Sequence, residues 1–186
     1  MTSPLHLVAL GANLDSPAGG PRDTLDAAVV AFADRGLDVV SRSRWFRTPA
    51  YPPGSGPEFV NGAVVLRSGL GPEAVLAELH AVEAALGRDR RRRWAPRACD
   101  LDLLASDDRV LPDAATVRAW MDLAGDDRLA VPPGLVLPHP RLHERGFVLA
   151  PLADVAPDWR HPLTGMSVVA MLAALPPEAL DGVAPL

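Results

Sequence analysis

Residues 87–104 constrain this chain most: six arginines fall within ten residues, and a strand-like run of alternating aspartate and leucine follows directly. Alternate residues of a β-strand share a face, so we expect Asp100 and Asp102 to project together while Leu101 and Leu103 point into the core. Two like charges on one face repel each other, and a bound cation would resolve that conflict. Carboxylate oxygens favour a hard ion such as Mg²⁺, which takes its remaining ligands from water and a substrate phosphate.

The arginines suit the same phosphates, because a guanidinium binds phosphate through two parallel hydrogen bonds and stays charged. They are Arg88, Arg90, Arg91, Arg92, Arg93 and Arg97. An arginine run standing alone is more often a solvated face or a nucleic-acid patch, and an Asp-x-Asp alone is weaker evidence still. The two motifs side by side, with Trp94 and Pro96 between them, favour a phosphate-and-metal site.

Charge is distributed unevenly along the chain, whose net charge is −5. Residues 88–97 hold six arginines and one aspartate, or +5, so the other residues hold 12 basic and 22 acidic groups, or −10. A local positive field on an acidic surface favours a small anionic ligand over a nucleic acid. All 18 basic residues are arginine, which excludes a Walker A lysine.

The length of 186 residues predicts a single domain over residues 1–186. No apolar run reaches the ~18 residues of a membrane span, and no basic stretch precedes an apolar one at the start, so we expect a cytoplasmic protein without anchor or signal peptide. Cys99 is the only cysteine, which excludes an internal disulfide and a cysteine zinc cluster.

Hydrophobic periodicity predicts an alternation of strands and helices. We expect strands over residues 6–11, 37–46, 58–66 and 100–104, and helices over 21–35, 71–86 and 165–175. Residues 107–134 are acidic and irregular, with a short helix around 114–123. The order β-α-β-β-α-β is typical of a ferredoxin-like α+β sandwich, a mainly antiparallel sheet with helices packed on it.

Several side chains outside the Arg/Asp stretch could form a binding site. Phe59 and Asn61 share one strand face, where they could stack on and hydrogen-bond a flat heterocycle, although a core phenylalanine beside a turn-facing asparagine fits these two residues equally well. His139 stands between two prolines, followed by Arg145 and Phe147, which adds a titratable donor, a fixed cation and a second aromatic ring.

Five motifs in this order resemble the 6-hydroxymethyl-7,8-dihydropterin pyrophosphokinase family of folate biosynthesis, over about residues 5–175. They are R-T-P-A-Y, E-F-V-N-G-A-V, E-A-A-L-G-R-x-R, R-W-A-P-R-A-C-D-L-D-L-L and P-H-P-R-L-H-E-R-G-F-V-L-A-P-L. The resemblance implies transfer of the β,γ-diphosphate of ATP to the hydroxymethyl group of the pterin, with release of AMP.

The resemblance also implies roles for individual residues. Asp100 and Asp102 would hold two Mg²⁺ ions and act in catalysis with Arg88 and Arg97. The ATP-binding residues would be His80, Glu83, Arg90, Arg93, Trp94, Leu103, His139 and Arg145. The pterin-binding residues would be Thr48, Pro49, Tyr51, Phe59, Asn61, Trp94, Asp100 and Phe147. The implied partners are ATP and a reduced pterin alcohol, with no nucleic acid and no membrane, and we expect a monomer.

Some positions depart from the family pattern. His80 stands where glutamine is common, and Phe59 where tyrosine is often found. Gly134 and Val136 replace polar residues that help to hold the nucleotide in some members, which leaves Arg128 as a candidate substitute. No side chain is an evident general base for the pterin hydroxyl, apart from an aspartate acting through its metal.

Two other functions would use part of the same pattern. A nucleic-acid-binding module would explain the arginines but leave Asp100, Asp102 and His139 without a role. A metal-dependent phosphohydrolase would direct the same carboxylates and arginines at water, and would release phosphate from ATP without a pterin.

Overall fold

A computed structural model describes residues 3–50, 56–87 and 98–186, and the statements below concern this part of the chain. Its centre is an antiparallel sheet in the order β5-β1-β4-β3-β6, with β2 also paired to β4. The strands are β1 (Leu5–Ala12), β2 (Asp38–Arg42), β3 (Phe46–Thr48), β4 (Phe59–Arg67), β5 (Asp100–Ser106) and β6 (Ala184–Pro185).

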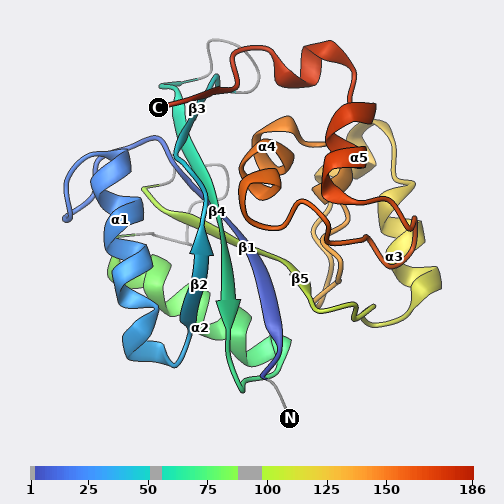
Figure 1. Ribbon diagram of the computed structural model, residues 1–186, viewed down its shortest axis with the longest axis horizontal. Helices are drawn as coiled ribbons and strands as arrows, with labels where there is room; N and C mark the ends of the chain where they lie inside the picture. Colours follow the sequence, from blue (N-terminus) through green and yellow to red (C-terminus); the bar gives the residue numbers. More distant parts are fainter. Residues whose placement is uncertain (1–2, 51–55, 88–97) are drawn as a thin grey trace.

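Helices cover both faces of the sheet (Figure 1). One face packs against α1 (Pro21–Ala31) and α2 (Pro72–Ala85), and the other against α4 (Gly146–Val155) and α5 (Val168–Ala174), while α3 (Ala114–Met121) lies farther out. Short 3₁₀ turns complete the chain: η1 (Ala33–Arg35), η2 (Gly125–Leu129), η3 (Leu142–Glu144) and η4 (Pro177–Leu180). No helix in the described ranges is long and apolar enough to cross a membrane.

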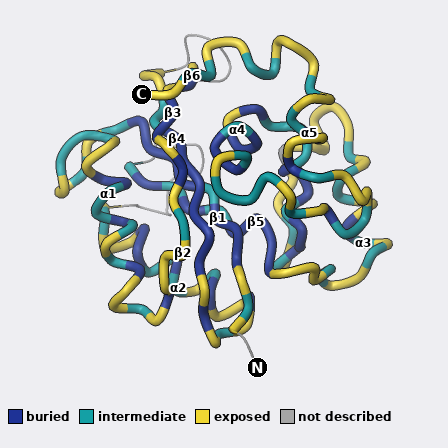
Figure 2. Tube along the Cα trace, viewed as in Figure 1, coloured by how far each residue is buried: buried dark blue, intermediate teal, exposed yellow. Residues whose placement is uncertain are grey.

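The two faces of β1 and β5 belong to two separate hydrophobic clusters. Leu10 and Leu101 are buried with the residues of α1 and α2, whereas Leu7 and Leu104 are buried with those of α4 and α5. Figure 2 shows β1, β4 and β5 as largely buried strands between the two helical layers. Because alternate residues point to opposite faces, each strand serves both clusters at once.

The ferredoxin-like α+β arrangement predicted from the order of elements is confirmed, since β1 lies between β4 and β5 and both α-helices of the pattern cover one face. Three expected boundaries are wrong. The helix expected over 165–175 begins only at Val168, as α5. The strand expected over 37–46 is split into β2 and β3, and between them the N–H of Ala63 on β4 donates to the side-chain Oγ of Ser43 at 2.9 Å. The helix expected over 21–35 ends at Ala31, and a 3₁₀ turn then leads to Gly36 in the left-handed conformation.

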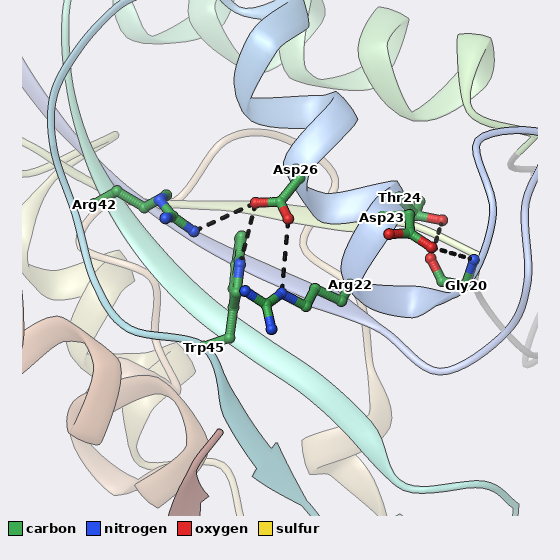
Figure 3. Close-up of polar contacts among 7 residues, drawn as sticks. All are labelled: Gly20, Arg22, Asp23, Thr24, Asp26, Arg42 and Trp45. Carbon is green, nitrogen blue, oxygen red and sulfur yellow. Dashed lines mark hydrogen bonds and ion pairs between the residues drawn. The ribbon is translucent and has the colours of Figure 1, made fainter.

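Asp26 connects the segment between β2 and β3 to α1 (Figure 3). Its carboxylate on α1 accepts a hydrogen bond from Trp45 Nε1 at 3.2 Å and from Arg42 at 3.4 Å, and the Arg42 guanidinium lies 5.0 Å from the Trp45 ring centroid. The ring fills the space over Gly62, where a Cβ atom would lie 2.3 Å from Trp45 Cζ3. The buried Trp45 indole, whose N–H is hydrogen-bonded, therefore connects β4 to α1.

Arg44, next in the chain to Trp45, points to the other helical layer. Its Nε and a terminal nitrogen donate to the two carboxylate oxygens of Asp154 at 2.9 and 2.8 Å. This two-fold contact joins the segment between β2 and β3 to the end of α4.

Candidate active site

The candidate site lies where β1, β4 and β5 meet under the start of α4. Gly11 of β1 is in register with Asn61 of β4 on one side and with Asp100 of β5 on the other. Directly paired residues of antiparallel strands project to the same face, so the amide and the carboxylate flank a position without a side chain. A Cβ atom at Gly11 would lie 2.8 Å from Asn61 Oδ1, so glycine keeps this space open.

The carboxylate pair of β5 follows the predicted alternation. Asp100 and Asp102 are half-buried on the α4 side, whereas Leu101 and Leu103 are 2% and 3% exposed in the cluster with α1 and α2. Ala9 is in register with Asp102, so a small residue lies beside this carboxylate too. Leu103, expected beside the adenine, therefore faces away from the aspartates.

These carboxylates fit a metal that completes its coordination with water and substrate. Within residues 3–50, 56–87 and 98–186, no group of three or more His, Cys, Asp or Glu side chains could hold an ion by itself. Two hard oxygen donors beside small residues suit Mg²⁺, which keeps several waters and is commonly held by one or two carboxylates plus phosphate oxygens.

Glu83 of α2 is completely buried, and its Oε1 accepts a hydrogen bond of 2.8 Å from the backbone N–H of Leu101. That N–H lies between the two aspartates on the edge strand of the sheet. The contact fixes β5 where it presents its carboxylates, a role that the sequence pattern did not indicate. His80 lies one turn earlier on α2 and is half-buried.

The predicted pterin side of the site is assembled from β3 and β4. Asn61 Nδ2 donates to Thr48 Oγ1 at 2.7 Å, and both residues are buried. This bond fixes the amide plane beside Gly11. Phe59 is in register with Thr48 and half-buried, and Pro49 follows at the surface.

The opposite wall comes from the segment that leads into α4. His139 is fixed to β5 by its backbone N–H, which donates to Leu104 O at 2.7 Å, and its Nδ1 accepts from the Arg141 N–H at 3.1 Å. The neutral ring therefore carries its proton on Nε2. Burial lowers the pKa of His139, the charge of Asp102 opposes that shift, and Arg145 reinforces it.

Arg145 directly precedes α4, and Phe147 is the second residue of that helix. Burial lowers the pKa of the Arg145 guanidinium, and the negative charges of Asp102, Glu144 and Asp100 partly offset this shift. Its Cζ lies 5.7 Å from the Phe147 ring centroid, and this ring is 40% exposed. A cation and an accessible aromatic face thus stand opposite the carboxylates.

Of the remaining candidate residues, one has a partner within the protein and the others lie outside the described ranges. Arg128, the candidate nucleotide contact, is paired with Glu144, which also contacts Arg141 at 3.4 Å. This pairing ties the irregular segment before His139 to η3 and was not visible in the sequence. The predicted site residues Tyr51, Arg88, Arg90, Arg93, Trp94 and Arg97 lie outside the described residues, so their roles stay predictions.

Comparison with known proteins gives consistent matches. A family model for 7,8-dihydro-6-hydroxymethylpterin-pyrophosphokinase matches residues 7–157. Relatives of this chain include proteins named 2-amino-4-hydroxy-6-hydroxymethyldihydropteridine pyrophosphokinase. The one from Synechocystis sp. is 35% identical over 96% of this chain and 80% of its own. The one from Methylorubrum extorquens is 36% identical over 95% of this chain and 96% of its own.

Solved structures share the fold. A crystal structure of an HPPK-DHPS protein in complex with substrates superimposes with a TM-score of 0.67 over 94% of this chain, at 12% identity. The wild-type HPPK-DHPS of Plasmodium falciparum gives a TM-score of 0.63 over 92% of this chain, at 13% identity. This chain spans 45% and 44% of the lengths of those two proteins.

Proposed function

The chain belongs to the 7,8-dihydro-6-hydroxymethylpterin-pyrophosphokinase family, and from this membership and the geometry above we propose how its residues divide the reaction between them. The protein transfers the β,γ-diphosphate of ATP to 6-hydroxymethyl-7,8-dihydropterin, giving the pterin diphosphate and AMP, in folate biosynthesis.

The pterin binds at the space above Gly11, between the β4 side of the site and α4. Asn61, held by Thr48, reads the polar edge of the ring, while Phe59 and Phe147 lie against its faces. The observation that carries this proposal is the register of Asn61, Gly11 and Asp100 on adjacent strands, which leaves an amide and a carboxylate on either side of an open position. A flat heterocycle with hydrogen-bonding edges matches that arrangement.

The triphosphate of ATP lies toward Asp100 and Asp102, which would hold two Mg²⁺ ions. When bound, such ions neutralise charge on the phosphate oxygens and orient the transferred group. Arg145 directly precedes α4, which packs on the face of β5 that carries both aspartates, so we assign it to the same phosphates, and His139 offers a donor at Nε2. Arg88, Arg90, Arg93, Arg97 and Trp94 would complete this side. The protein's contribution is mainly positioning and charge stabilisation, because phosphoryl transfer needs little covalent help.

Identification of the adenine-containing product tests the reaction directly. The protein is incubated with ATP, Mg²⁺ and the reduced pterin alcohol, and the nucleotide is analysed. AMP formed only when the pterin is present supports diphosphate transfer. ADP or inorganic phosphate released without the pterin would instead favour a phosphohydrolase.

Substitutions test the metal-binding role. Asp100→Asn and Asp102→Asn should each lower turnover at least tenfold, which is about 1.4 kcal/mol in the barrier, and weaken Mn²⁺ binding measured by calorimetry. Asp158→Asn is the matched control, because Asp158 is exposed in the turn that follows α4. Full activity and unchanged Mn²⁺ affinity in either site variant would refute the assignment.

A further inference from the structure

Residues 176–186, here called the strap, lie beyond residue 157, where the family match ends. The strap contains η4 and β6 and runs from the end of α5 across the sheet edge to β3 (Figure 1). It contacts both sides of the proposed pterin site.

The first contact is with the start of α4. A Cβ atom at Gly146 would lie 2.0 Å from Ala179 O and 2.9 Å from Leu180 Cδ2, so the strap backbone rests directly on the helix at this residue. Gly146 stands between Arg145 and Phe147, the two α4-side residues of the site. Only glycine permits so close an approach, and any shift of η4 would therefore act on the turn that carries the aromatic ring.

The second contact is with β3 and the residue after it. β6 pairs with β3 through Arg47 and Ala184, and the N–H of Leu186 donates to Trp45 O at 2.9 Å. Gly182 has φ of +71°, and a Cβ atom there would lie 3.0 Å from Pro49 Cδ. The strap thus adds an outer strand to β3, which carries Thr48 and, through it, the amide of Asn61.

We propose that the strap is a positioning element for the pterin, which fixes the spacing between Phe147 on α4 and the Thr48–Asn61 pair on β3 and β4. The two sides belong to different layers, and the strap is in backbone contact with both of them. A flat ligand between them is sensitive to their separation, since misplacement by about 1 Å can cost orders of magnitude in rate. The inference rests on the proposed pterin site and adds the element that sets its width.

Two glycine substitutions with nearly equal backbone strain provide the test. Gly182→Ala introduces a side chain at φ +71° and presses on Pro49, whereas Gly165→Ala introduces one at φ +72° with no atom within 4 Å. Both should lower the melting temperature through the same backbone strain, and Gly182→Ala should lower it somewhat more because of the contact with Pro49. Only Gly182→Ala should raise the KM for the pterin, by something on the order of tenfold, with the KM for ATP nearly unchanged.

Calorimetry with the pterin alone and with MgATP alone separates binding from turnover. Weaker pterin binding with unchanged nucleotide binding in Gly182→Ala supports the proposal. Equal pterin affinity in Gly182→Ala and Gly165→Ala would overturn it. Failure of the proposed function would look different, because the unmodified protein would then form no AMP with the pterin.

Discussion

Replacing Gly11 with alanine should damage pterin recognition more than it damages the fold. Gly11 is not among the residues with positive φ, so alanine is compatible with its backbone. The new Cβ would lie 2.8 Å from Asn61 Oδ1, which is the end of a movable side chain. The strand can therefore keep its pairing while the amide turns away from its present position.

The cost to stability is modest. Turning Asn61 breaks its 2.7 Å hydrogen bond to Thr48 Oγ1. Leaving buried polar groups unpaired costs about 1–3 kcal/mol. Replacing glycine with alanine stabilises the folded protein by about 0.4–1 kcal/mol, because alanine restricts the unfolded chain. The net loss of unfolding free energy is then roughly 0–2.5 kcal/mol. The lost contact to the pterin edge is worth about 1–3 kcal/mol, or roughly 5- to 150-fold in the dissociation constant.

Gly62→Ala is the matched control, because it places the same methyl group on the opposite face of the sheet. There a Cβ atom would lie 2.3 Å from Trp45 Cζ3, a buried ring that cannot move aside. Overpacking of this kind costs about 1–3 kcal/mol. Urea unfolding should therefore show a lower unfolding free energy, while the ligand affinities of the folded protein stay unchanged. Calorimetric titration of both variants with pterin and with MgATP decides the matter. An unchanged pterin affinity in Gly11→Ala would refute the reasoning.

Three further perturbations have defined outcomes. Phe147→Ala should weaken pterin binding by roughly 1–3 kcal/mol with little effect on MgATP in calorimetry, because the ring is 40% exposed; equal losses for both ligands would mean that α4 has shifted. Glu83→Leu should lower stability in urea unfolding by about 1–3 kcal/mol, because it leaves the buried N–H of Leu101 unpaired. Glu83→Gln keeps an acceptor and should recover much of that loss; equal losses would contradict this role. Burial, reinforced by His143, lowers the pKa of His161 from 6.5 to about 4. The unfolded chain therefore binds the proton first, so unfolding free energy should decrease as pH falls from about 6.5 toward 4, by up to about 3 kcal/mol. His161→Gln should flatten that dependence, and an equally steep profile would exclude this residue as its source.

Features that depend on local spacing could be predicted from the sequence. The alternation of Asp100 and Asp102 with Leu101 and Leu103 follows from the two-residue period of a strand, and it assigned two carboxylates to one face before any partner was known. In the same way Pro72 and the apolar stripe after it defined α2 to within a residue at each end. The motifs around these elements then indicated the family.

Which distant residues meet could be seen only in the folded chain. Register between strands is a long-range property, so nothing in the local pattern places Gly11 between Asn61 and Asp100. The burial of Glu83 against the Leu101 N–H was equally hidden, because a glutamate on the flank of a helical stripe suits a surface pair just as well. The strap shows the limit most clearly: the sequence gives no sign that Gly146 and Gly182 lie against other segments, and the close approaches at both come from atoms that a distant part of the chain brings within contact distance.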